Sequence, residues 1–337
     1  MKFYAGLDVS MATTAVCVVD LGGEVVFERS VESVPGVITD ALTPYHDALE
    51  VVVLEAGPMS EWLARGLQEA GLPVTQMETR QVAAALSAQM EKTDRNDARG
   101  IAKLLRLGWF RPVHLKSCEA RERRLLLSAR KTVQGRLIEV ENSVRGLLRG
   151  FGLRPGRYLR KRWAGEIRTL IAGHPALEIA LGPLIEARES LRLALEELTA
   201  RVHEEVLNDP VCQRLMTVPG VGPLVALTYV ATIDDPTRFR SSKQVGSSVG
   251  LTPRRYQSGE QDRAGTITKC GDPALRVALY EAANVMMVNV KRWFPLRSWA
   301  MRVAARRGAK RAKVALARKL AVILHRMWVD ETEFQMG

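Results

Sequence analysis

Two aspartates in the segment KTDRNDAR, residues 92–99, have the spacing expected of side chains that act together. Asp94 and Asp97 are three residues apart at the start of a predicted helix, so both project from one helical face. Two carboxylates held this close repel each other unless a cation lies between them. The pair therefore either caps the helix N-terminus, where acidic residues are favoured, or forms part of a metal site.

Two further acids, Asp8 and Glu55, follow short apolar segments. Asp8 lies in YAGLDVS and Glu55 ends the run VVVLE, and both segments are typical of buried strands. An acid at such a position is unfavourable without a partner. Together with the two aspartates of KTDRNDAR they form a D-E-D-D set of carboxylates, the ligands that Mg²⁺ prefers.

The first hundred residues predict the elements that would position these acids. Three short strands within residues 3–31 precede alternating helices and strands, in the order βββαβαβα. This order is typical of the ribonuclease H-like (RuvC-like) α/β fold, in which the strands bearing Asp8 and Glu55 are neighbours and the helix with the two aspartates packs beside them. We expect all four acids to meet at one edge and to hold two Mg²⁺ ions roughly 4 Å apart, which would polarise a phosphate.

A second fold with an early aspartate has to be weighed against this one. Sugar kinases and actin-like ATPases carry an acid in their first hairpin, but they also need Gly-rich phosphate loops further along the chain. The sequence has no such loops. The D-E-D-D interpretation is therefore favoured over an ATPase.

Composition favours a protein that binds an anionic partner. The chain has 337 residues and a formal net charge of +12, with an isoelectric point near 9.8, and nucleic acid is the commonest partner of such a chain. Its four cysteines have neither zinc nor disulfide spacing. Without a signal-peptide pattern or a long apolar run, we expect a cytoplasmic location and no membrane partner.

Residues 119–207 predict helices on either side of a basic linker. Apolar residues recur there at heptad spacing, which indicates either a helical hairpin within the chain or a coiled coil between subunits. These residues are Leu126, Val133, Leu137, Val140, Val144 and Leu147, then Leu191, Leu195, Leu198 and Val202. The linker RPGRYLRKRW combines aromatic with basic side chains and suits a nucleic-acid backbone with stacked bases, although a solvated linker has a similar composition. The residues concerned are Arg157, Tyr158, Arg160, Lys161, Arg162 and Trp163.

Residues 208–337 carry two more patterns typical of nucleic-acid binding. The turn PGVG, residues 219–222, lies between apolar helices, as in a helix-hairpin-helix motif or in a plain helical turn. Residues 282–329 contain many Lys and Arg but neither Asp nor Glu, and they predict two basic helices with an apolar face. We expect the charged face of this tail to contact phosphates.

Ser258 lies in a Gly-rich and Arg-rich stretch, residues 249–280. A serine hydroxyl attacks phosphorus only when its proton is removed and the charge of the phosphate is neutralised. The cations expected to bind nucleic acid here are Arg254, Arg255, Arg263, Lys269 and Arg276. A lone serine in a turn is more often a turn former, so spacing alone leaves both roles open.

Taken in order, several of these segments resemble one protein family. GLDVS, LEAG, KTDRNDAR, PGVG and GLTPRRYQSG followed by ITKCGDPALR are similar to the transposases of the IS-one-ten and IS-eleven-eleven insertion sequences, relatives of the Piv DNA invertases. Each segment is weak alone, and the ordered set is specific. The resemblance implies a RuvC-like domain at 1–118, a coiled-coil segment at 119–207 and a mainly α transposase domain with a helix-hairpin-helix at 208–337.

The resemblance also implies which residues react. It assigns Asp8, Glu55, Asp94 and Asp97 as catalytic ligands of Mg²⁺ or Mn²⁺, and Ser258 as the catalytic serine that forms a covalent phosphoserine with DNA. A structured bridge RNA would guide a dimer or tetramer, associated with the bacterial nucleoid, to element ends and target DNA. The alternative is a RuvC-like junction nuclease that uses the same acids with water as nucleophile.

Overall fold

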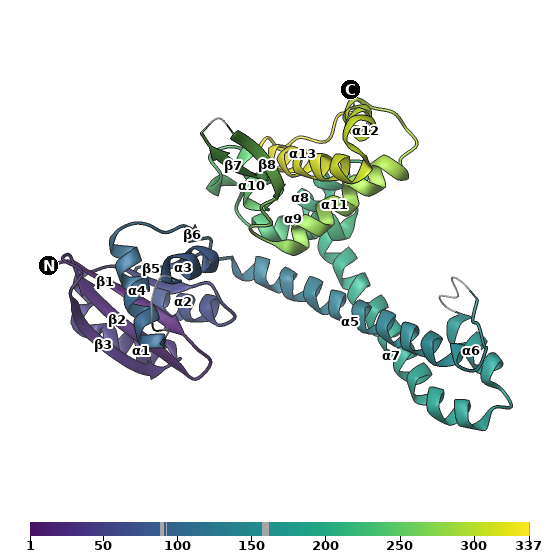
Figure 1. Ribbon diagram of the computed structural model, residues 1–337, viewed down its shortest axis with the longest axis horizontal. Helices are drawn as coiled ribbons and strands as arrows, with labels where there is room; N and C mark the ends of the chain where they lie inside the picture. The colour runs from purple at the N-terminus through teal and green to yellow at the C-terminus, as the bar shows by residue number, and fades with distance from the viewer. Residues whose placement is uncertain (88–90, 92, 157–161, 260, 337) are drawn as a thin grey trace. The chain divides into compact units, whose positions relative to one another are not determined.

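The chain forms two compact units, Met1–Lys116 and Ser117–Gly337, in the computed structural model (Figure 1). The structure describes residues 1–87, 91, 93–156, 162–259 and 261–336. The N-terminal unit is a mixed α/β sheet structure, and the C-terminal unit is mainly helical. This order of an α/β region followed by helices confirms the coarse prediction, while the division into three domains stays a prediction.

A six-stranded sheet forms the centre of the N-terminal unit, with the strand order β3-β2-β1-β4-β5-β6. β1, β2 and β3 are joined as antiparallel hairpins, β4 lies parallel to β1, and β5 lies parallel to β4. The strands are β1 (Phe3–Val9), β2 (Thr13–Asp20), β3 (Val25–Glu32), β4 (Leu49–Glu55), β5 (Val74–Met77) and β6 (Pro112–Val113). Apart from the short β6, the order of elements is the predicted one.

Helices cover both faces of this sheet. They are α1 (Pro35–Leu42), η1 (Thr43–Ala48), α2 (Ser60–Glu69), α3 (Thr79–Leu86) and α4 (Asp94–Arg106). Leu7 and Leu54 face the buried side chains of α1 and α2, whereas Val53 contacts the cluster formed by α3 and α4. Because successive strand residues point to opposite faces, strands covered on both sides are continuously apolar. This explains why β1 and β4 could be recognised as unbroken apolar runs.

Gly6 allows α4 to lie directly on β1. A Cβ atom at this position would be 2.5 Å from both the backbone nitrogen of Ala102 and the carbonyl oxygen of Ala98. Ala98 and Ala102 are themselves fully buried. Three small residues in contact thus set the distance between the helix that begins with Asp94 and the strand that carries Asp8.

Replacing Gly6 with alanine should destabilise the protein, because the new methyl group would overlap backbone atoms that cannot rotate away. We expect a loss of about 1–3 kcal/mol in the free energy of unfolding, the usual range for overpacking. Urea unfolding of the full chain, followed by circular dichroism, measures it. Gly36→Ala is the matched control, since no atom lies within 4 Å of a Cβ there. Equal urea midpoints for the two variants would contradict this account of the contact.

Two long helices open the C-terminal unit and pack against each other (Figure 1). They are α5 (Cys118–Arg149) and α7 (Pro175–Leu207), and the shorter α6 (Trp163–Ile171) lies between them in sequence. Arg130 Nε donates to Thr199 Oγ1 at 2.9 Å, and Arg188 Nη2 lies 2.7 Å from Glu141 Oε1. The partners advance along α5 while they go back along α7, so the helices are antiparallel. The two helices therefore form a hairpin within one chain, although the heptad residue Leu147 is 51% exposed. A coiled coil between subunits stays a prediction.

The prediction that Trp163 stacks on bases is wrong. Its side chain is 1% exposed and packs in the small core that joins α6 to α5 and α7. The guanidinium of Arg188 lies over the ring, 5.0 Å from its centroid. A base has no access to a ring held in this way.

The helices of the rest of the C-terminal unit pack around one apolar core, and the β7–β8 hairpin extends from it. The elements of this region are α8 (Pro210–Met216), α9 (Pro223–Ile233), η3 (Pro236–Arg238), α10 (Lys243–Ser248), β7 (Pro253–Ser258), β8 (Gln261–Ile267), α11 (Pro273–Val288), α12 (Pro295–Arg307) and α13 (Ala309–Val329). In the PGVG turn, Gly220 has φ +91 and lies so close to α11 that a Cβ would be 2.6 Å from the Ala282 carbonyl oxygen. Within the described residues, no helix combines the length and apolar character needed to cross a bilayer.

Candidate active site

Asp8 and Glu55 lie side by side at the carboxyl ends of two parallel strands. The register of β1 and β4 pairs Leu7 with Leu54, and each acid is the next residue on its strand. Both acids are half-buried. Because neighbouring strands are about 5 Å apart, the two carboxylates emerge close together at one edge of the sheet.

The direction of α4 follows from contacts at its two ends. At its C-terminal end, Arg106 Nη1 donates to the carbonyl oxygen of Leu21, 2.9 Å away, in the turn that follows β2. The end of β2 is paired with the start of β1, since Asp20 lies opposite Phe3. The C-terminus of α4 is therefore near the beginning of β1. Its N-terminus points toward the other end of the strand, where Asp8 lies.

Asp94 and Asp97 occupy the first turn of α4, on the side that faces the sheet. They come one helical turn before Ala98 and Ile101, which are fully buried against the strands. Asp94 is exposed and Asp97 is half-buried. The backbone thus brings both aspartates to the edge at which Asp8 emerges.

Neither aspartate is the N-cap residue of α4. Thr93 is the N-cap of α4, and its Oγ1 accepts a hydrogen bond from the backbone nitrogen of Asn96 at 3.1 Å. Asp94 and Asp97 lie inside the helix, where they favour the positive end of its dipole without serving as the cap residue. This arrangement leaves their carboxylates for another role. Among the described residues, however, no three His, Cys, Asp or Glu side chains are grouped closely enough to hold a metal ion.

The two arginines of KTDRNDAR fix α4 to the sheet, a function that the sequence analysis missed. Arg99 Nε and Nη2 lie 2.5 and 2.8 Å from the two carboxylate oxygens of Glu28 on β3, and Arg95 binds the same carboxylate. The Glu28 side chain is 9% exposed. Burial would raise the pKa of Glu28, but the hydrogen bonds from Arg99 and Arg95 outweigh it and lower the pKa below 4.5. The i, i+4 spacing of the arginines was the available sign of a shared partner.

Glu28→Gln should destabilise the protein by about 1–3 kcal/mol at neutral pH, because the three charged hydrogen bonds from Arg95 and Arg99 are weakened at a position with little exposure. Since the folded-state pKa lies below the ordinary value of 4.5, the stabilisation is complete above pH 4.5 and is lost as the pH falls through the folded-state pKa. Urea midpoints of wild type and variant should therefore converge in acid. Glu32→Gln, an exposed change on the same strand, is the control. A difference that stays constant with pH would rule out the ion pair as its cause.

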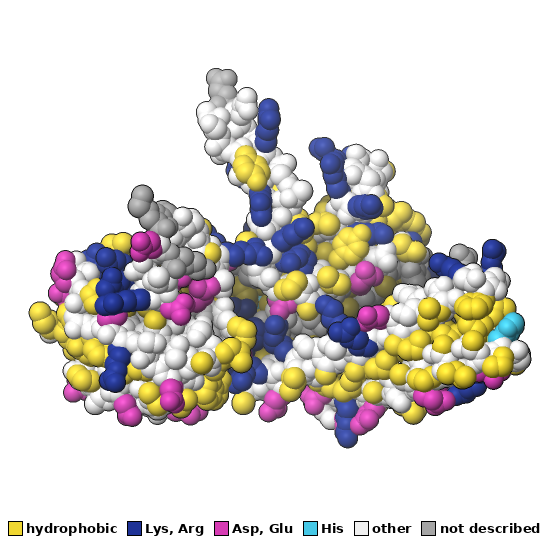
Figure 2. All heavy atoms as spheres, turned by 60° about the horizontal axis from the view of Figure 1, so that its bottom comes forward, with side chains coloured by type: hydrophobic (Ala, Val, Ile, Leu, Met, Phe, Trp, Pro, Cys, Tyr) yellow, Lys and Arg dark blue, Asp and Glu magenta, His cyan; other side chains and the backbone are white. Residues whose placement is uncertain are grey.

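Ser258 is the last residue of β7 and is paired with Gln261 of β8. Every residue of β7 is exposed, and in Figure 2 the hairpin projects from the C-terminal unit with basic side chains along it. Side chains alternate along the strand, so Arg254, Tyr256 and Ser258 share one face, and Arg263 lies opposite Tyr256 on that face. An accessible hydroxyl thus has two arginines on its own side of the hairpin.

Two of the other predicted cations are engaged within the protein. Arg255 lies on the opposite face and binds Asp262 through two hydrogen bonds of 2.8 and 2.6 Å. Arg276 Nη1 donates to the carbonyl oxygens of Val249 and Cys270, at 2.9 and 3.0 Å. Arg276 therefore joins the two connections at the base of the hairpin. Its contacts favour a positioning role over direct binding of nucleic acid.

The linker cations fall largely outside the described residues. Arg157, Arg160 and Lys161 belong to this group, so their role stays a prediction. Arg162, directly before α6, is exposed. Lys269, a predicted cation outside the linker, has φ +56 and lies in the connection between β8 and α11.

Comparison with known proteins identifies the family. A transposase family model of the DEDD type matches residues 5–152, and a model described as "Transposase IS116/IS110/IS902 family" matches residues 212–297. The transposase for insertion sequence element IS1111A of Coxiella burnetii is 30% identical over 98% of this chain and 91% of its own length. The chain belongs to the IS116/IS110/IS902 family of transposases. It is therefore an enzyme that cleaves and rejoins DNA.

Other relatives of this transposase agree with the assignment. A probable family 20 transposase of Pseudomonas aeruginosa is 31% identical over 85% of the chain and 86% of its own length. A pilin gene-inverting protein of Moraxella lacunata is 31% identical over 32% of the chain and 34% of its own length. The predicted resemblance to insertion-sequence transposases and to the invertases is confirmed. The four acids fall within the first matched region and Ser258 falls within the second.

Proposed function

We propose that this transposase cleaves DNA by attack of the Ser258 hydroxyl on phosphorus, at a site completed by Asp8, Glu55, Asp94 and Asp97. The observation that supports the proposal is the register of β1 and β4, which makes Asp8 and Glu55 neighbours, together with the direction of α4, whose first turn carries Asp94 and Asp97. The same arrangement supports a RuvC-like fold for this unit.

The chemistry of this donor set fits a hard divalent cation. Carboxylate oxygens are the preferred ligands of Mg²⁺, and of Mn²⁺ in similar sites. Four carboxylates that meet at one edge would repel one another, and a bound cation would relieve this repulsion. We propose Asp8, Glu55, Asp94 and Asp97 as the ligands of two ions. Bound Mg²⁺ would polarise the scissile phosphate and stabilise the attacking and leaving oxygens.

The protein's own residues account for the transfer step. Arg254 and Arg263 lie on the face of the hairpin that carries Ser258 and would neutralise the phosphate oxygens. The Ser258 hydroxyl loses its proton and its oxygen forms a bond to phosphorus, while the bond from phosphorus to one DNA oxygen breaks. That oxygen takes up a proton and leaves as a hydroxyl, so the proton count is unchanged. A DNA hydroxyl then attacks the phosphoserine, which releases the serine and joins the strands. The covalent intermediate conserves the bond energy that hydrolysis would lose.

We also propose the partners that the sequence predicts. The net charge of +12 and the basic tail support binding of DNA and of a structured guide RNA. The heptad residue Leu147 of α5 is exposed, which supports a coiled coil with a second copy in a dimer or tetramer. Because the acids and Ser258 belong to separate compact units, one working site could combine residues of two chains.

A label-transfer experiment tests the proposal. The purified full chain is incubated with Mg²⁺, element-derived RNA and labelled DNA carrying element ends and target, and is then run on a denaturing protein gel. Label retained on the protein supports the phosphoserine. Cleaved DNA without any labelled protein would instead indicate the metal-dependent junction nuclease with water as nucleophile. Omitting the RNA in a parallel reaction tests the guide.

A further inference from the structure

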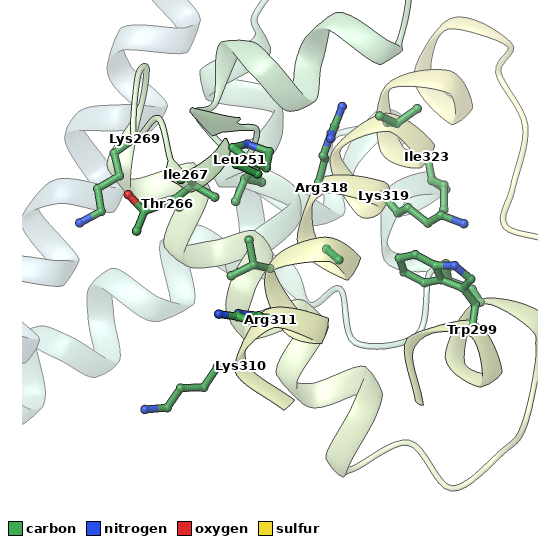
Figure 3. Close-up of a pocket in the computed structure, with 17 residues that line it drawn as sticks. Leu251, Thr266, Ile267, Lys269, Trp299, Lys310, Arg311, Arg318, Lys319 and Ile323 are labelled. Atoms are coloured by element: carbon green, nitrogen blue, oxygen red, sulfur yellow. The ribbon is translucent and has the colours of Figure 1, made fainter. Parts of the chain in front are cut away.

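A large groove lies between the β7–β8 hairpin and helices α12 and α13 (Figure 3). Its volume is about 1180 Å³, beyond the usual range of small-molecule sites. Leu251 and Ile267 line it from the hairpin side, and Trp299, Val314 and Ile323 line it from the helices. The floor is therefore apolar, and it is built from segments far apart in the sequence.

The rim of this groove is basic. It carries Lys269, Lys310, Arg311, Arg318 and Lys319. The helical side contributes no opposing charge, because residues 282–329 contain neither Asp nor Glu. Figure 3 shows Lys310 and Arg311 toward one end and Lys319 toward the other. An apolar floor between two groups of cations complements a polyanion that also has apolar surface to bury.

Trp299 gives the floor a specific shape. It is half-buried, and Lys319 Nζ lies 4.0 Å from the centroid of its ring. Aromatic rings beside cations are the usual platforms for unpaired bases, which stack on the ring while their phosphates contact the cations. A duplex hides its bases in the helix and would leave this floor uncovered. The groove therefore fits a single strand.

The groove also has a direct link to the proposed nucleophile. Pro253 and Ile267 at the base of the hairpin line it, and Ser258 lies at the other end of β7. Six residues of extended strand span roughly 17 Å, so only a few nucleotides of a strand attached to Ser258 would be needed to reach the groove.

We propose that this groove binds the unpaired DNA strand next to the cleaved phosphodiester, with its bases on the apolar floor at Trp299 and its phosphates along the basic rim. The proposal rests on the function proposed above and adds a binding site for single-stranded DNA to it. We favour DNA over RNA, because the 2′-hydroxyl is the group by which a protein distinguishes RNA from DNA at a given site. The only side-chain hydroxyl among the described lining residues is that of Thr266.

Binding measured without catalysis tests the groove. The full chain carrying Ser258→Ala, in EDTA, is titrated into fluorescent oligothymidylate and into duplex DNA. Adding Trp299→Leu should weaken binding of the single strand by about 5- to 100-fold, the effect of losing one stacked base, and leave duplex binding within twofold. Lys310→Gln with Arg311→Gln should reduce the salt dependence of single-strand binding by roughly 0.7 for each phosphate that is no longer neutralised.

Matched variants keep the result interpretable. Arg302→Gln with Arg306→Gln removes the same charge from exposed positions of α12 outside the groove and should change single-strand binding less than twofold. Lys319→Gln, which leaves the tryptophan in place, should weaken binding without a change in the urea midpoint. Oligothymidylate carrying 5-iodouracil should form a photochemical crosslink to the peptide that contains Trp299.

Three results would overturn the proposal: equal losses for single strand and duplex, equal losses in the control variant, or tighter binding of oligouridylate RNA than of oligothymidylate. Because the assay lacks both Ser258 and metal, it can fail while the covalent adduct still forms. Conversely, the groove can bind single-stranded DNA even if the label-transfer experiment yields no covalent adduct. The two proposals are therefore tested separately.

Discussion

Ser258→Ala should abolish the covalent protein–DNA adduct and lower the rate of strand cleavage by about 10⁴-fold or more, as removal of a nucleophile does in other enzymes. The expected loss is large because the exposed hydroxyl at the end of β7 would be the atom that attacks phosphorus. Alanine removes only this oxygen from a solvent-exposed position, so stability should be unchanged. Gel retention of labelled DNA and single-turnover cleavage rates measure the two effects.

A second serine provides the control for this experiment. Ser247 is exposed in α10, and its hydroxyl donates to the Gln244 carbonyl oxygen within the same helix. Ser247→Ala should cleave and form the adduct at the wild-type rate. If Ser258→Ala cleaved as fast as wild type, with no labelled protein in either, water would be the nucleophile. The cleavage step would then be metal-dependent hydrolysis of the phosphodiester.

The arrangement of the acids could be predicted from the sequence only in part. The apolar runs before Asp8 and Glu55 identified both strands, because strands covered on two faces leave a continuous pattern. Their pairing, with Leu7 opposite Leu54, required the fold. The side of the sheet on which α4 packs is set by Gly6, whose role depends on Ala98 and Ala102, distant in the sequence. Nothing in the composition of GLDVS shows that its glycine contacts a helix.

The other features that the sequence did not predict depend on side chains that are far apart in the chain. Arg99 and Glu28 are separated by 71 residues, and the local spacing of the arginines could show that they share a face but not which acid they bind. Trp163 stands in a basic segment, and local composition favoured an exposed ring. It is buried because α6 packs on α7, where Arg188 covers the ring. The groove at Trp299 is likewise lined by two segments that are far apart in the sequence, so no local pattern could predict it.

Neutralising one acid of the D-E-D-D set should remove activity without unfolding the protein. Asp97→Asn keeps the size and shape of the side chain but loses the charge that a divalent cation requires. We expect cleavage and adduct formation to fall by about 10³-fold or more, since losing a catalytic metal removes several kcal/mol of transition-state stabilisation. Removing metal with EDTA should have the same effect on wild type, and Mg²⁺ or Mn²⁺ should restore it.

The free energy of unfolding distinguishes a catalytic role of Asp97 from a structural one. The interaction of Asp97 with the dipole of α4 contributes at most about 1 kcal/mol to the free energy of unfolding, so the urea midpoint in EDTA should change little. Asp40→Asn, at an exposed position of α1, is the control and should keep full activity. Inactive Asp97→Asn that also unfolds at much lower urea would assign this carboxylate to the fold. An inactive variant with wild-type stability and intact DNA binding would assign it to the reaction, because only a group that acts on the scissile phosphate separates binding from cleavage in this way.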